Sequence, residues 1–158
     1  MGAGTVIASA IGIILLIITA YFLIGGTLSA AKTAVLAQRD ASQQENQRIH
    51  TRIEIMNASA NTDDKVTFIE VENTGSEVIG DFGHMEVYLF QGTQPYTYTN
   101  FSGQWNYTLQ RDMVNPGLLD PDEVVNITVP YAGADPAWVK VATANGVYDS
   151  AYLPKSSP

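Results

Sequence analysis

The sequence contains no cysteine and few charged side chains. Without cysteine the chain has no disulfide framework, no thiolate metal site and no cysteine nucleophile. Charged residues make up 15 % of the 158 residues, below the roughly 25 % that is typical of soluble globular proteins. The deficit lies at the N-terminal end, because the first charged side chain is Lys32. This uneven distribution excludes an ordinary cytosolic globule.

Basic residues are scarce as well. Eight Lys and Arg stand against sixteen Asp and Glu, which gives a formal net charge of -8. A chain with this balance is repelled by a phosphate backbone, so we expect no nucleic-acid partner. The length fits one domain with an appended segment.

Motifs of catalysis and metal binding are missing from the sequence. It has two histidines, His50 and His84, and no HExxH, glycine-rich phosphate loop or G-x-S-x-G. Asp120, Asp122 and Glu123 precede a run of Val and Thr, and carboxylates of this kind can bind Ca²⁺. Asp-Pro-Asp before a strand is more typical of a solvated turn. We therefore expect no enzyme activity, no metal site and no cofactor.

A long apolar run opens the chain, and residues 5–24 read TVIASAIGIILLIITAYFLI. At about 1.5 Å per residue, a helix of this length spans roughly 30 Å, the thickness of a bilayer core. A secretory signal peptide has a basic n-region and a shorter apolar run, whereas nothing basic precedes this one. We expect a retained, single-pass helix in the cytoplasmic membrane.

The next segment favours a polar helix. Residues 27–50 are rich in Ala, Gln and Leu and contain no Pro or Gly. Their apolar positions Val35, Leu36 and Ile49 form no wide stripe, and such a helix is solvated on nearly all sides. We interpret it as a stalk. The sequence thus predicts a transmembrane helix and stalk over 1–52 and a separate domain over 53–158.

From about residue 52 the hydrophobic pattern changes to an alternating one. Seven or eight short runs, separated by Gly, Pro, Asn and Asp, occupy about a hundred residues, and these numbers fit an immunoglobulin-like β-sandwich. Asn145-Gly146 between two such runs predicts a hairpin with a type I′ turn. The run 66–71 changes phase, which predicts a bulge near Phe68-Ile69 or a strand covered on both faces.

Two sequence signals disagree on membrane orientation. Four basic residues within 32–52 follow the apolar run, and the positive-inside rule would keep that side cytoplasmic. Four N-x-[ST] triplets instead suggest an exported domain with glycosylation acceptors. These acceptors are Asn57, Asn100, Asn106 and Asn126. The alternative interpretation of the triplets is ordinary Asn and Thr usage in a β-rich domain.

Three motifs occur in a family's order along the domain. Asn73-Thr74-Gly75-Ser76 is followed by the apolar run 85–89 and Gly92, then by the turn NPGLLDPDE at 115–123. The stretch 138–147 reads WVKVATANGV and ends in the Asn145-Gly146 hairpin. With the apolar N-terminal helix, this set resembles the archaeal flagellin (archaellin) superfamily. The accessory proteins FlaF (ArlF) and next FlaG (ArlG) are the most similar members.

The resemblance implies a role in the archaellum, the archaeal flagellum. Filament-forming members carry a short basic leader, whereas Met1-Gly2-Ala3-Gly4 has no basic residue, so an accessory protein is favoured. Such a protein would be a membrane-anchored stator whose domain, in the pseudoperiplasm of the cell envelope, binds the S-layer protein and supports motility. Its other partners would be a FlaG-like protein and the archaellin filament. The alternatives are a subunit of an archaellum or type IV-pilus-like filament, and an extracytoplasmic ligand-binding module.

An aromatic stretch is the candidate binding surface. It contains Tyr96, Tyr98, Phe101, Trp105 and Tyr107 without basic residues between them, and it is either sandwich core or a protein-binding loop. Because aromatic residues dominate interface hot spots, Tyr96 and Tyr98 are the expected contact residues. Open edge strands also invite pairing, which makes a homodimer a further expectation.

Overall fold

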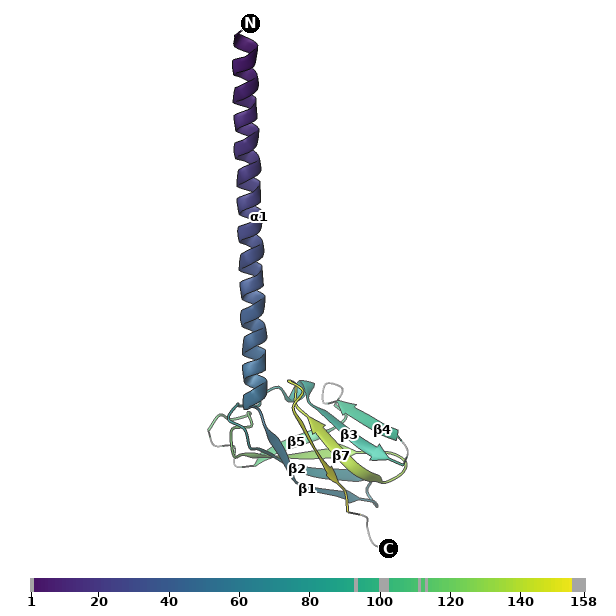
Figure 1. Ribbon diagram of the computed structural model, residues 1–158. Helices are drawn as coiled ribbons and strands as arrows, with labels where there is room; N and C mark the ends of the chain where they lie inside the picture. Colours follow the sequence, from purple (N-terminus) through teal and green to yellow (C-terminus); the bar gives the residue numbers. More distant parts are fainter. Residues whose placement is uncertain (1, 93, 100–102, 111, 113, 155–158) are drawn as a thin grey trace. The chain divides into compact units, whose positions relative to one another are not determined.

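The computed structural model describes residues 2–92, 94–99, 103–110, 112 and 114–154. The chain divides into two compact units, Met1–Gln43 and Gln44–Pro158. Figure 1 shows a long helix and a body made of strands. Each unit is considered separately below.

Helix α1 (Ala3–His50) is continuous over 48 residues, and none of them is buried. It passes through Gly25 and Gly26 without interruption. By length and composition it is able to cross a membrane. The hydroxyl groups of Thr19 and Thr27 donate to the carbonyl oxygens of Leu15 and Leu23 at 3.0 and 2.9 Å, so these polar groups are satisfied inside the helix, as a lipid environment requires.

The second unit is a sandwich of two antiparallel four-stranded sheets. One sheet has the strand order β1-β2-β6-β5 and the other β4-β3-β7-β8. A short helix η1 (Phe82–His84) precedes β3. The strands are β1 (Ile53–Asn61), β2 (Val66–Asn73), β3 (Glu86–Gln91), β4 (Gln94–Thr99), β5 (Asn106–Gln110), β6 (Val124–Pro130), β7 (Pro136–Ala142) and β8 (Tyr148–Tyr152).

The core lies between the two sheets and follows the alternation in the sequence. In the four central strands, β2, β3, β6 and β7, one side is buried, and its members include Val71, Val87, Leu89, Ile127 and Val139, all fully enclosed. A strand places successive side chains on opposite faces, so every second residue enters this core. The predicted fold, a membrane-length helix followed by an all-β sandwich, is confirmed.

The prediction for the run 66–71 was wrong. Strand β2 pairs without interruption with both neighbours, and the irregularity lies in β1, between Ile55 and Asn57. Phe68 points outward with 47 % of its surface exposed, so the strand is not covered on both faces. Thr67 takes the buried position next to Ile69. The phase never changes, because a threonine fills a core position while a phenylalanine faces out.

The hairpin at Asn145-Gly146 is present, but its predicted turn type was wrong. Strands β7 and β8 pair from Ala142 and Tyr148 inward, so five residues connect them. Gly146 has φ +81° while Asn145 keeps a negative φ, whereas a type I′ turn needs positive φ at both central residues. The loop is closed by bonds from Thr143 N to Val147 O at 2.8 Å and from Gly146 N to Thr143 O at 2.9 Å.

Candidate functional site

The end of α1 is bonded into the sandwich at a junction that we call the joint, formed by Gln47, His50–Arg52, Asn73–Ser76 and Asn145. All of these residues belong to the second unit. The buried Thr51 ends the helix, with its backbone N and its Oγ1 both donating to Gln47 O at 2.9 and 2.8 Å. Two further segments of the chain then close on this point.

The first segment is the family motif Asn73–Ser76. Gly75 N donates to Arg52 O at 3.0 Å, and Ser76 N donates to His50 O at 2.9 Å. A Cβ on Gly75 would lie 2.5 Å from both Arg52 N and His50 O, a separation that real Cβ atoms do not show. Only glycine therefore allows the two backbones to approach this closely.

Asn73 organises the motif from inside the protein. Its side chain is fully buried. Nδ2 donates to Glu77 O at 2.8 Å and to Leu119 O at 3.0 Å, while Oδ1 accepts from Gly75 N at 3.1 Å. Burial of an amide is tolerated because its polar atoms are paired in this way. One side chain thus fixes the motif to a distant loop.

The second segment is the hairpin between β7 and β8. Asn145 Nδ2 donates to Thr51 Oγ1 at 2.7 Å, and Asn145 Oδ1 accepts from Thr143 Oγ1 at 2.6 Å. Two of the three motifs that carry the archaellin resemblance therefore meet at the same place, the end of α1. Their chemical role there is to hold backbone together.

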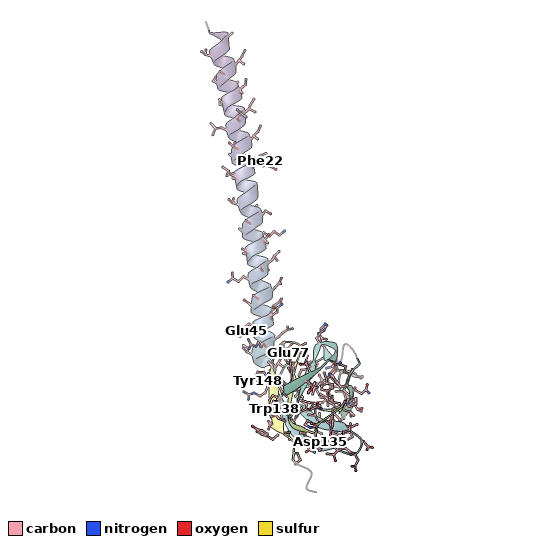
Figure 2. The ribbon with its side chains drawn as sticks, turned by 90° about the vertical axis from the view of Figure 1, so that its right-hand side faces the viewer. Phe22, Glu45, Glu77, Asp135, Trp138 and Tyr148 are labelled. Atoms are coloured by element: carbon pink, nitrogen blue, oxygen red, sulfur yellow. The ribbon has the colours of Figure 1, made fainter. Side chains whose placement is uncertain are left out.

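The opposite end of the sandwich carries a polar cluster, which we call the far-end cluster: Lys65, Tyr131 and Asp135. Figure 2 shows Asp135 at the end of the sandwich away from Glu77, which neighbours the joint. Asp135 Oδ1 accepts from Lys65 Nζ at 2.8 Å and from Tyr131 Oη at 2.9 Å. The bond from Lys65, then that from Tyr131, lowers the pKa of Asp135. Burial, aided by Asp135, raises the pKa of Tyr131 to about 12.

The expected contact residues Tyr96 and Tyr98 lie on β4, at the open edge of its sheet. Tyr96 is 52 % exposed. Tyr98 is half-buried and packs against the core, and burial is the main cause that raises its pKa. The rest of the stretch divides: Trp105 is buried, Tyr107 stacks on Phe82 with ring centroids 4.3 Å apart, and Phe101 lies outside the described residues.

A second aromatic surface, which sequence reasoning missed, covers the outward side of β3, β7 and β8. We call it the aromatic face, and it consists of Glu86, Tyr88, Phe90, Trp138, Lys140, Tyr148 and Tyr152. Trp138 and Tyr148 are labelled in Figure 2. Tyr148 and Tyr152 are 60 % and 85 % exposed. Its signal in the sequence is alternation: the aromatic residues occupy alternate positions along their strands, and most of the residues next to them are small or aliphatic.

The described glycosylation candidates lie on strands of the other sheet. Asn57 on β1 and Asn106 on β5 are exposed, and Asn126 on β6 is half-buried. In the sheet Asn57 is paired with Glu70, Asn106 with Thr128, and Asn126 with Thr108. All three asparagines therefore lie on the outward face of the β1-β2-β6-β5 sheet. Asn100 lies outside the described residues.

The candidate cation ligands before β6 hold a turn. Asp120 carboxylate oxygens accept from Asn115 N at 3.0 Å and Asn115 Nδ2 at 2.7 Å. Glu123 Oε2 accepts from Asp120 N at 3.1 Å. Among the described residues, no group of three or more His, Cys, Asp or Glu is placed to hold a metal. The histidines contact nearby groups, with His50 Nδ1 2.7 Å from Asn46 O and His84 Nδ1 2.8 Å from Asp81 Oδ1.

Solved protein structures share this architecture. No family model matches the chain. An uncharacterized protein of Archaeoglobus fulgidus is 26 % identical over 153 residues, which is 96 % of this chain and 95 % of that protein. The archaellum periplasmic stator protein FlaG of Sulfolobus acidocaldarius aligns with a TM-score of 0.51 and 19 % identity, over 64 % of this chain and 97 % of FlaG.

The archaeal flagellum of Methanospirillum hungatei strain JF1 aligns over a longer part of the chain. The TM-score is 0.65 at 13 % identity, and the alignment covers 96 % of this chain and 94 % of the flagellum chain. The alignment with FlaG covers about two thirds of this chain, and the alignment with the flagellum chain covers nearly all of it. The chain thus has the fold of archaellum proteins, an N-terminal helix that leads into a β-sandwich, as the resemblance of its motifs implied.

Proposed function

We propose that the chain is a membrane-anchored, non-enzymatic stator component of an archaellum motor. In this role α1 anchors the protein in the cytoplasmic membrane, its polar half is the stalk, and the sandwich binds the S-layer protein outside. The fold shared with FlaG supports the assignment to the archaellum. A FlaG-like protein and the archaellin filament are the further partners that we propose.

The joint is the observation that carries this proposal. A stator has to transmit force between its anchor and its grip, so the element that links them must resist bending where it enters the domain. Here residues 50–52, at and just after the end of α1, are bonded to two separate segments, Asn73–Ser76 and Asn145, by neutral bonds of 2.7 to 3.0 Å. A module that only captures a ligand has no need of such a connection.

An extracytoplasmic position of the sandwich is part of the proposal. Asn57 and Asn106 are exposed acceptors on one outward face, where a glycosylating enzyme of an exported compartment can reach them. The basic residues that follow the apolar run argue for the opposite orientation. We favour the exported position because the fold is shared with a protein described as periplasmic.

The grip is assigned to the edge strand β4, where Tyr96 is half exposed. Tyrosine contributes a large contact area at low conformational cost and is enriched among hot spots. An edge strand also offers unpaired backbone groups for a partner. Tyr98 lies two residues further along the same strand and packs against the core.

A filament subunit is the second candidate, and the alignment with the archaeal flagellum over 96 % of this chain favours it. In such a fibre apolar helices would bundle in the core. The stalk part of α1 is poorly suited to that, because charged residues from Lys32 onward leave no wide apolar stripe. We therefore rank the stator first.

Co-sedimentation tests the proposal. The full chain in lipid nanodiscs is mixed with S-layer sheets isolated from an archaeon that encodes it, and the sheets are pelleted. Saturable recovery in the pellet is expected, and Tyr96→Ala should weaken it about tenfold. Tyr152→Ala is the matched control, an equally simple loss of an exposed tyrosine on another surface, and should leave binding unchanged.

Two results would count against the stator. If the wild-type chain stays in the supernatant and is instead recovered in fibres sheared from cells, the filament candidate replaces it. If binding is saturable but Tyr152→Ala weakens it and Tyr96→Ala does not, the stator stands and the grip moves to the aromatic face.

A further inference from the structure

The outward face of the β1-β2-β6-β5 sheet exposes an aromatic ring near its centre. Phe68 lies on β2, an inner strand, and 47 % of its surface is exposed. The register places Ser59 of β1 and Thr128 of β6 directly opposite it, one on either side. Among the paired residues on this face it is the one aromatic side chain. Two hydroxyl neighbours do not explain why a phenylalanine faces outward here.

Two glycosylation triplets converge on this ring. Ser59 is the last residue of the triplet that starts at Asn57, and Thr128 is the last residue of the triplet that starts at Asn126. Asn57 lies two residues before Ser59 on the same strand and is therefore a diagonal neighbour of Phe68, about 7–8 Å away. The ring is thus flanked by the hydroxyl residues of two acceptor triplets.

The irregularity in β1 is what turns Asn57 outward. Ile55 packs against the core, and strict alternation would give Asn57, two residues later, the same inward side. The register shift between Ile55 and Asn57 changes the side, so Ala58 enters the core while Asn57 is exposed and paired with Glu70. Bulges often redirect a side chain in this way. The acceptor is therefore held out on an edge strand, where an enzyme can reach it.

The acceptors on this face differ in access to the ring and to solvent. Asn126 is half-buried on the inner strand β6, and its Oδ1 is enclosed without a hydrogen-bond partner. Asn106 is exposed on the other edge strand, β5, but Thr128 lies between it and Phe68. Asn57 is the acceptor that is both exposed and adjacent to the ring.

We propose that Asn57 carries an N-linked glycan whose first sugar residues lie across Phe68. A pyranose ring presents C–H groups on one face, and such a face packs on the electron-rich face of an aromatic ring. The hydroxyl groups at the rim of the sugar are then free to bond to Ser59 and Glu70. This inference rests on the exported position of the sandwich, which is part of the proposed function.

The charge of this face favours a sugar over a protein as the occupant. Glu54, Glu70 and Glu72 point outward from β1 and β2, and the paired strand residues of the face include no Lys or Arg. A protein that covers Phe68 has to supply a cation for each carboxylate that it takes out of water. A glycan is narrow and hydrated, so it covers the ring and leaves the carboxylates solvated.

Peptide mass spectrometry tests the modification. The full chain is purified from the membranes of an archaeon that encodes it. We expect a glycan on the peptide that contains Asn57, lost in Asn57→Gln and in Ser59→Ala but retained in Ser59→Thr. Asn126 should be unmodified, because its side chain is enclosed. An unmodified Asn57 would overturn the proposal.

A double-mutant cycle tests the contact with the ring. In protein from the native host, Asn57→Gln should lower the midpoint of thermal unfolding by roughly 4 °C. In the Phe68→Thr background the same change should lower it by about 1 °C or less, since the glycan has lost its platform. Asn106→Gln is the matched control and should have the same effect whether residue 68 is Phe or Thr. Protein made in a bacterium that lacks the modification should show no coupling between Asn57 and Phe68.

Equal effects of Asn57→Gln in both backgrounds would overturn the contact with Phe68. Coupling that persists in the unmodified protein would also overturn it and assign the effect to the asparagine itself. Labelling of Gln110→Cys in intact cells by a membrane-impermeant maleimide separates this proposal from the stator, because the chain has no cysteine of its own. Labelling with an unmodified Asn57 disproves only the glycan. Labelling that occurs only after lysis disproves the exported position, and both proposals fail with it.

Discussion

The two ends of the sandwich are held by different kinds of contact. At the joint, Asn73 and Thr51 are buried and their bonds are neutral. In the far-end cluster the Lys65–Asp135 ion pair is 2.8 Å long, but 43 % and 48 % of the two side chains are exposed. A buried, paired polar group is costly to disrupt, whereas an exposed ion pair contributes about 0–1 kcal/mol.

In the proposed stator the joint is the end that carries load, and the far-end cluster closes a loop. Neutral buried bonds do not weaken with salt or between mild acid and base, since neither partner is ionised and screening acts on charges. The far-end cluster contains three ionisable groups and responds to both. Within the second unit, the backbone at the end of α1 is therefore held by contacts whose strength does not depend on salt.

The largest expected effect is at Gly75. Gly75→Ala places a methyl group 2.5 Å from two backbone atoms of the joint, and the helix end must move to relieve the overlap. We expect a loss of about 3 kcal/mol, measured as a lower midpoint of thermal unfolding by near-ultraviolet circular dichroism of the full chain in micelles. Gly83→Ala is the control, because its nearest contact would be an ordinary 3.6 Å. Equal effects of the two would contradict the account of the joint.

The same substitution at the two ends sharpens the comparison. Asn73→Ala removes partners from two carbonyl oxygens and an amide inside the protein, so a loss of about 2–3 kcal/mol is expected. Asn61→Ala removes the bonds to Asp63 N and Asp64 N in an exposed turn beside the far end, and about 0.5–1 kcal/mol is expected. Thermal midpoints of both variants measure the difference. A smaller loss for Asn73→Ala than for Asn61→Ala would refute the contrast.

Sequence patterns were sufficient for the helix, the sandwich and most of its strands. The apolar run and the alternation are local signals, and both depend on few neighbouring residues. The alternation failed at Phe68, because hydrophobicity alone does not say that Thr67 fills the core and Phe68 faces out. That choice is made by the strands on either side, which lie far away in the sequence.

The site was harder to predict for the same reason. Asn73 was recognisable as part of a motif, but its partner Leu119 is 46 residues away, and the bond from Asn145 to Thr51 spans 94. The aromatic face combines strands β3 and β8, which are separated in the sequence by four other strands. By contrast, Tyr96 and Tyr98 are only two residues apart in the sequence, so their pairing is a local signal.

The far end offers the smallest predicted effect, a dependence of stability on alkaline pH. The pKa of Tyr131 is about 12 in the folded protein and 10.0 as the ordinary value. A raised pKa contributes stability that is complete below pH 10 and is lost as the pH rises toward 12, because the unfolded chain releases its proton first. Between pH 9 and 11 this amounts to about 1 kcal/mol.

The pKa values of Tyr88 and Tyr98 are also raised, so the wild-type curve contains their contributions. Tyr131→Phe isolates the far-end cluster, since it removes the hydroxyl that donates to Asp135 and keeps the ring beside Lys65. Thermal midpoints at pH 7, 9 and 11 should fall less steeply for this variant than for the wild type. The hydrogen bonds of Asn73 join neutral groups, so Asn73→Ala should lower the midpoint by the same amount at all three pH values. A slope that Tyr131→Phe leaves unchanged would mean that the alkaline response originates elsewhere, and the two ends would no longer differ in the way proposed.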